Sequence, residues 1–181
     1  MKFIPGQKAP LFAVQDIFGN TVNLAQIQNQ KIILSFFRYA TCPMCNVQIA
    51  KIMQQKEYFE KNNLKVIAVF ESSAESLMEY IVDRHDFHFT ILADPNRELY
   101  RMYGVKPSWL KTLKTLSLKG LENILLALKK GYKIISKVEG TVNQIPADFL
   151  IDEDKIIRIA HYGDSVVDHY PLENFLRWDS L

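Results

Sequence analysis

The chain has 181 residues, of which 48% are hydrophobic and 23% are charged, and it carries a formal net charge of +2. These values are ordinary for a globular protein and exclude collagen-like, mucin-like and intrinsically disordered chains, while the small net charge argues against nucleic-acid binding. No stretch approaches the ~20 apolar residues of a membrane span, and the first residues lack the apolar run of a secretory signal. We therefore expect a cytoplasmic protein without membrane contact and without a nucleic-acid partner.

Strand and helix patterns alternate along the chain. Short alternating runs on either side of Gly19-Asn20 predict an N-terminal β-hairpin. Further on, apolar β-rich runs predict strands, and apolar residues at helical spacing predict helices. The predicted strands are 31–37, 64–70, 89–92, 148–152 and 155–161, and the predicted helices cover 45–59, 72–84, 96–103 and 171–178. This order predicts an α/β fold with a central mixed β-sheet flanked by helices, formed by a single domain over residues 1–181.

A basic segment interrupts this alternation at about 106–140. Residues 106–137 hold eight lysines and one acidic residue, so they carry +7 and the rest of the chain −5. One helical face of the segment holds three apolar residues, Trp109, Leu113 and Leu116. Lys111 and Lys114 face away from them. We expect a helical insert that packs its apolar stripe on the core and leaves its lysines in solvent; a lid, a docking face and a patch for anionic membranes are the alternatives.

The chain contains only two cysteines, Cys42 and Cys45, separated by Pro43 and Met44. Cys42 is predicted at the start of the helix that follows a buried strand. Free backbone N–H groups and the helix dipole stabilise a thiolate at that end, and such sites lower a cysteine pKa from about 8.5 to roughly 3.5–7.5. Cys45, one turn later, can close a disulfide with Cys42. Just past the strand, Arg38-Tyr39 would add a positive charge and a hydroxyl near the pair.

Other uses of a cysteine pair fit the sequence less well. A zinc site would need two further ligands. His85 and His88 are three residues apart, but they come just before a predicted strand and are expected at the surface or as capping residues. Two inert structural cysteines remain an alternative. We expect no metal and no bound cofactor, because the cysteines themselves would be the redox centre.

Four parts of the chain carry a resemblance to a known family. They are residues 5–24, 36–46, 92–105 and 145–152. The second resembles the active-site loop F-Y-R-G-x-W-C-P-Y-C-N, and the third is similar to D-P-x-x-x-L-A-x-x-Y-G-V. Taken in this order, they resemble the peroxiredoxin-like family of alkyl hydroperoxide reductase and thiol-specific antioxidant (AhpC/TSA) within the thioredoxin-fold superfamily. The resemblance covers most of the chain outside the basic segment.

The resemblance implies a thioredoxin-like fold, a Cys42–Cys45 dithiol/disulfide cycle and an external thiol reductant of the thioredoxin or glutathione type. A homodimer is compatible with it. It further implies that Pro146 forms a cis peptide bond beside the cysteines and, with Ile145, shapes a groove for a disulfide or peroxide substrate. The residues expected to support this groove are Arg38, Tyr39, Thr41 and Pro43.

The peroxide-activating pattern P-x-x-x-T-x-x-C of peroxiredoxins has no match in this loop. Alignment on Cys45 puts Arg38 and Cys42 at the Pro and Thr positions, and alignment on Cys42 puts Ser35 and Tyr39 there. The arginine that usually precedes the late F-x-I-D strand is also absent. The dithiol apparatus is therefore intact where the peroxide apparatus is not.

The main functional prediction is a thiol–disulfide oxidoreductase with an antioxidant role, in which Cys42 attacks and Cys45 resolves the mixed disulfide. One alternative is a peroxiredoxin-type hydroperoxide reductase, with Cys45 as the peroxidatic and Cys42 as the resolving cysteine. Another is a redox-switched binding protein that contacts its partner through the basic insert.

Overall fold

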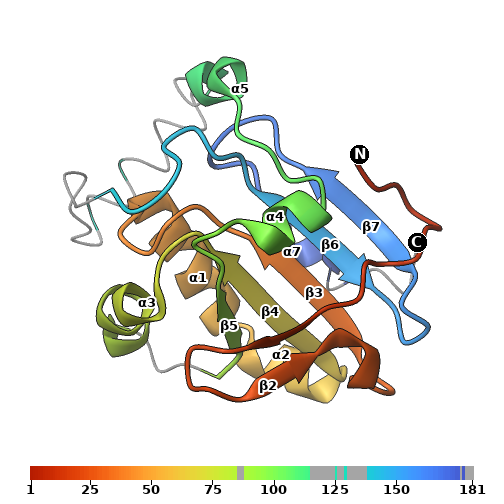
Figure 1. Ribbon diagram of the computed structural model, residues 1–181. Coiled ribbons are helices and arrows are strands. Elements are labelled where there is room, and N and C mark those ends of the chain that lie inside the picture. The colour runs from red at the N-terminus through yellow and green to blue at the C-terminus, as the bar shows by residue number, and fades with distance from the viewer. Residues whose placement is uncertain (85–87, 115–124, 126–128, 130–137, 176, 178–181) are drawn as a thin grey trace.

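A five-stranded mixed β-sheet lies at the centre of the protein (Figure 1). The computed structural model describes residues 1–84, 88–114, 125, 129, 138–175 and 177. The strands are β3 (Lys31–Phe36), β4 (Leu64–Phe70), β5 (Thr90–Ala93), β6 (Ala147–Ile151) and β7 (Ile157–Tyr162), in the spatial order β5-β4-β3-β6-β7. The first three run parallel, and β6 and β7 are each antiparallel to their inner neighbour. The prediction of a mixed sheet is confirmed.

Strand β3 occupies the middle of the sheet because both of its faces are apolar. Ile32, Leu34 and Phe36 join the core on one face, while Ile33 and the following Phe37 join the core on the other. Side chains alternate between the faces of a strand, so a continuous apolar run is typical of a strand buried on both sides. The loop that leaves this strand is therefore held by the most buried part of the protein.

The two faces of the sheet are covered by different elements. The predicted hairpin, β1 (Ala13–Gln15) with β2 (Thr21–Asn23), and helix α4 (Glu98–Met102) cover one face (Figure 1). A short 3-10 helix, Leu24–Gln26, follows the hairpin. The other face is covered by α1 (Pro43–Met53), α2 (Lys56–Lys61), α3 (Ala74–Tyr80), with the 3-10 turn Val82–Arg84, and α7 (Leu172–Phe175). This arrangement confirms the predicted thioredoxin-like fold.

The helix predicted over residues 45–59 is divided in two. Helix α1 ends at Met53, and α2 begins at Lys56. Both helices still bury their predicted apolar residues, since Ile49, Ile52 and Phe59 belong to the same core. Among the described residues, no helix has the length and apolar character needed to cross a membrane.

The orientation predicted for the start of the basic insert is wrong. In α5 (Trp109–Leu113), Trp109 is 66% and Leu113 is 64% exposed. The lysine expected in solvent contacts the body instead: Lys111 Nζ donates to the carbonyl of Gly163 at 2.6 Å and lies 2.9 Å from Asp164 Oδ1. These polar contacts turn the apolar residues outward. Leu116 and most of the remaining insert lie outside the described residues.

Candidate active site

The two cysteines lie where β3 leads into α1. Cys42 is the N-cap residue of the helix, with extended backbone angles, and Pro43 occupies its first turn. Proline suits this position because the first helical N–H groups have no partner within the helix. Cys45 follows one turn later in α1 and is part of the hydrophobic core on this face of the sheet. The predicted position of Cys42 at the helix start is confirmed.

The loop before Cys42 is fixed by hydrogen bonds from buried side chains. The amide of Asn46 donates to the carbonyls of Ala40 at 2.9 Å and Cys42 at 3.0 Å. Ser72, after β4, accepts from the Ala40 N–H at 2.8 Å, and the Cys42 N–H donates to the Tyr39 carbonyl at 3.0 Å. The sulfur of Cys42 is therefore placed by a rigid turn.

A buried guanidinium stands beside the first sulfur. Arg38 Nη1 lies 3.6 Å from Cys42 Sγ, and the other terminal nitrogen, Nη2, contacts the Tyr39 hydroxyl at 3.5 Å and the carbonyl of Val142. Cys42 is only 1% and Cys45 only 2% exposed. The site thus combines two buried sulfurs with a positive charge; burial disfavours an anionic sulfur, whereas the neighbouring guanidinium favours one.

The pKa values of the two thiols are shifted in opposite directions. The hydrogen bond from the Cys45 thiol is the largest influence on Cys42 and lowers its pKa, whereas burial raises it. The charge of Arg38 and the backbone N–H groups of Cys45 and Met44 lower the pKa further, to about 6. Burial, together with the hydrogen bond and charge of Cys42, raises the pKa of Cys45 well above its ordinary value. At neutral pH the pair therefore consists of a Cys42 thiolate that accepts a hydrogen bond from a Cys45 thiol.

The remaining predicted site residues divide into two groups. Tyr39 and Thr41 are buried in the cysteine loop. Ile145 and Pro146 precede β6, and with Lys111, Tyr162 and other residues they line a cavity of about 160 Å³ that includes neither cysteine.

The expected cis bond at Pro146 is wrong, because the described residues contain no cis peptide bond. The trans bond lets the chain continue extended into β6. There the Gly163 N–H donates to the Pro146 carbonyl at 3.0 Å, which lengthens the β6–β7 pairing beyond Ala147 and Tyr162.

Several polar residues near the site had no signal in the sequence. The buried Glu71 carboxylate pairs with the partly exposed Arg97, and the carbonyl of Val142 accepts a hydrogen bond from Arg38. On the same sheet face as the cysteines, Asp148 contacts His169. Each partner is distant in sequence, so spacing could not reveal the contact. In the part of the chain that the structure describes, no three His, Cys, Asp or Glu side chains gather to hold a metal.

The chain matches the model of the AhpC/TSA family over residues 5–160. The Mycobacterium tuberculosis protein MT2597, whose name describes it as a peroxiredoxin, is 26% identical to this chain over 171 residues. The match covers 93% of this chain and 90% of that protein. The thiol-disulfide oxidoreductase ResA of Halalkalibacterium halodurans is 24% identical over 102 residues, or 56% of this chain and 57% of ResA.

The fold also resembles solved peroxiredoxin structures. Peroxiredoxin 6 of Arenicola marina superposes with a TM-score of 0.73 and 17% identity, over 98% of this chain and 72% of that one. The fold, the cysteine pair and the match over most of the sequence lead to one conclusion. The protein belongs to the AhpC/TSA family and is a peroxiredoxin-like oxidoreductase of the thioredoxin fold.

Proposed function

We propose that this protein is a peroxiredoxin-type hydroperoxide reductase in which the Cys42 thiolate attacks the peroxide and Cys45 resolves the product. The observation that carries the proposal is the position of the Cys42 sulfur beside a buried guanidinium. Cys42 has a pKa of about 6 and lies 3.6 Å from the Arg38 guanidinium, whereas the pKa of Cys45 is raised by burial. Because the thiolate is the nucleophile, these directions favour Cys42 over Cys45 as the attacking residue.

The proposed reaction has three steps. The Cys42 thiolate attacks the terminal oxygen of a hydroperoxide ROOH, the O–O bond breaks, and the RO⁻ leaving group takes a proton from water to give ROH. Cys42 is then a sulfenic acid. The Cys45 thiol condenses with it, forming the disulfide and releasing one water. One external dithiol, or two molecules of a monothiol, finally reduces the disulfide by thiol–disulfide exchange and is itself oxidised to a disulfide.

Burial distinguishes this reaction from disulfide reduction, the main prediction from the sequence. A protein disulfide must bring its own sulfur against Cys42, which is 1% exposed. A small hydroperoxide needs far less room. The name of the M. tuberculosis relative favours the peroxide reaction as well, while the likeness to ResA keeps disulfide exchange as the second candidate.

Family membership implies a thiol reductant and a peroxide substrate, and we propose a thioredoxin- or glutathione-type donor for the former. The Cys42–Cys45 disulfide formed with each peroxide reduced takes two electrons from this donor to return to the dithiol. The homodimer, the single domain and the cytoplasmic location stay predictions.

Mixing the fully reduced protein with one equivalent of hydrogen peroxide tests the proposal. We expect both thiols to be lost within seconds at neutral pH, with one intramolecular disulfide as the product. Free thiols are counted against time in a stopped-flow instrument, and the disulfide is identified by mass spectrometry. Loss of thiols over many minutes, beside rapid reduction of an added disulfide, would instead establish a dithiol reductase.

The pH dependence of the peroxide reaction provides a second prediction. With a Cys42 pKa of about 6, the rate should be constant above about pH 7 and fall roughly tenfold per pH unit below the pKa, since only the thiolate reacts. Arg38→Met should move this fall to higher pH, because the neighbouring positive charge is lost. A profile identical in wild type and Arg38→Met would contradict the assigned role of the guanidinium.

A further inference from the structure

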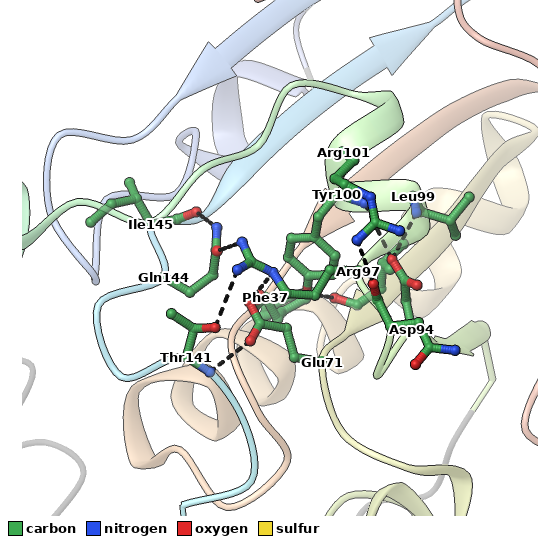
Figure 2. A network of polar contacts seen from close by, with 12 residues as sticks. Phe37, Glu71, Asp94, Arg97, Leu99, Tyr100, Arg101, Thr141, Gln144 and Ile145 are labelled. Atoms are coloured by element: carbon green, nitrogen blue, oxygen red, sulfur yellow. Dashed lines mark hydrogen bonds and ion pairs between the residues drawn. The ribbon is translucent and has the colours of Figure 1, made fainter.

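A buried polar network lies beside the cysteine loop, formed by residues that the proposed reaction does not use (Figure 2). Glu71 follows β4, and its side chain is 2% exposed. Its Oε1 lies 3.3 Å from Arg97 Nε, and its Oε2 accepts from the Thr141 N–H at 2.7 Å. Arg97 also donates to Thr141 Oγ1 at 3.3 Å and to Gln144 Oε1 at 2.6 Å. The two charged residues thus hold the segment 140–144 at three points.

Both charged side chains are themselves held in place. Arg97 is the N-cap of α4 and has a left-handed backbone, with φ of 59°, which is disfavoured for a residue with a Cβ. Its N–H donates to the Asp94 carbonyl at 2.9 Å. The Asp94 carboxylate accepts from the N–H groups at the start of α4, two of them at 2.8 Å. A strained conformation fixed in this way indicates a side chain that must point in one direction.

The segment held by Glu71 and Arg97 reaches the active site through Val142. The Val142 carbonyl accepts from Arg38 Nη2, and the same guanidinium places Nη1 at 3.6 Å from Cys42 Sγ. The main chain of Glu71 contributes too, because its N–H donates to the Arg38 carbonyl at 2.9 Å. A continuous set of contacts therefore joins the ion pair to the sulfur.

The segment also fits closely against the loop that carries the cysteines. A Cβ added to Gly140 would lie 3.0 Å from Glu71 Oε2, 3.2 Å from Glu71 Cβ and 3.4 Å from Tyr39 Cβ. A side chain at this position would displace the carboxylate that holds Thr141. At Gly140 the segment therefore packs directly against Glu71 and Tyr39.

We infer that Glu71 and Arg97 are positioning residues, which hold the segment 140–144 so that the Val142 carbonyl keeps the Arg38 guanidinium against the Cys42 sulfur. The inference rests on the proposed role of Cys42 as the attacking thiol. Neither residue touches the reacting atoms. Their effect passes through one main-chain carbonyl and one guanidinium.

The test is a pH titration of the Cys42 thiol in Glu71→Ala, in which the ultraviolet absorbance of the thiolate is measured at each pH. The two accounts of Glu71 differ in sign. If its charge alone mattered, removing a carboxylate would lower the pKa of Cys42, because a negative charge near a thiolate disfavours it. If Glu71 positions Arg38, its loss should raise the pKa of Cys42 by about one unit, since the guanidinium is released.

Three further variants complete the experiment. Arg97→Lys keeps the charge but lacks the planar fork that reaches three partners, so it should raise the pKa of Cys42 in the same direction. Arg101→Ala removes a cation from α4. The Arg101 side chain donates to the Asn96 carbonyl at 2.7 Å, away from the segment 140–144, so this variant should leave the titration unchanged. In an Arg38→Met background, Glu71→Ala should no longer raise the pKa.

An unchanged or lowered Cys42 pKa in Glu71→Ala would overturn the inference. Circular dichroism checks that each variant is folded, and Arg97→Lys, which keeps the charge, takes the place of the alanine variant as the test if Glu71→Ala fails to fold. The titration involves no peroxide. If the wild-type protein did not react with hydrogen peroxide, the proposed function would be wrong, but the titration would still test the positioning role of Glu71. If the wild-type protein reduced peroxide and Glu71→Ala showed no rise in the Cys42 pKa, the inference would be wrong and the proposed function would stand.

Discussion

Replacing Cys42 with serine should abolish the rapid reaction with hydrogen peroxide, whereas replacing Cys45 with serine should stop the cycle one step later. In Cys42→Ser the remaining thiol is buried and has a raised pKa, so it stays protonated at neutral pH. We expect the rate of peroxide consumption to fall by about a thousandfold or more, as for removal of other enzymatic nucleophiles. In Cys45→Ser the nucleophile and Arg38 are both present, so the first step should persist and leave a sulfenic acid on Cys42.

The measurement is a stopped-flow peroxide assay, with trapping of the sulfenic acid by dimedone and location of the adduct by mass spectrometry. The two variants control for each other, because each removes one sulfur from the same buried site. An adduct on Cys45 in Cys42→Ser, with no rapid reaction in Cys45→Ser, would assign the attack to Cys45. That result would agree with the peroxiredoxin register, in which Cys42 occupies the Thr position.

The sequence predicts the sheet well because burial leaves a strong local pattern. Strands β3 and β4 are buried on both faces, so most of their six and seven residues are apolar, without the alternation of a half-buried strand. The hairpin is equally local, since Gly19, with φ of 85°, supplies the turn. Helix boundaries are less certain, as the break between Met53 and Lys56 shows: both sides bury apolar residues, and nothing in the pattern marks the gap.

The part of the site formed by residues close together in sequence is also predictable. Cys42, Pro43 and Cys45 occupy one helix start, and Arg38 lies four residues before the first sulfur. The partner that orients Arg38 is not predictable, because Val142 is 104 residues away in sequence.

The predictions for Lys111 and Pro146 were wrong because contacts with residues distant in sequence determine their conformations. Lys111 turns inward because Asp164 and the Gly163 carbonyl are there to receive it. Pro146 is trans in a segment that already pairs with Gly163 as an extended strand.

Loss of the Asp148 carboxylate should strongly destabilise the fold. Asp148 lies in β6 opposite Ser35 and is 2% exposed. Both carboxylate oxygens lie 3.1 Å from Nδ1 of His169, one of them accepts from the Tyr170 N–H at 2.8 Å, and the His169 ring centre is 4.7 Å from that of Phe37. Asp148→Ala would leave a buried imidazole without its partner. We expect it to reduce the free energy of unfolding by about 3–5 kcal/mol, as for other broken buried pairs.

The pH dependence of this loss has a definite sign. Burial raises the pKa of Asp148, but the charge and hydrogen bond of His169, with the Tyr170 N–H and Ser35, outweigh it and lower that pKa in the folded protein. A carboxyl with a lowered folded-state pKa stabilises the fold fully above its unfolded-state pKa of about 3.9 and loses that contribution as the pH falls through the folded value. The difference between wild type and Asp148→Ala should therefore be large at pH 7 and shrink in acid.

Urea unfolding at neutral and acidic pH measures both effects, with Asp164→Ala as the matched control. Asp164 also pairs with a basic side chain, Lys111, at 2.9 Å, but its own side chain is 70% exposed, so water replaces the partner and little stability should be lost. Equal losses in the two variants at pH 7 would show that burial gives the Asp148 pair no special weight. A larger loss for Asp148 that persists unchanged into strong acid would place its origin in packing around Phe37 rather than in the carboxylate charge.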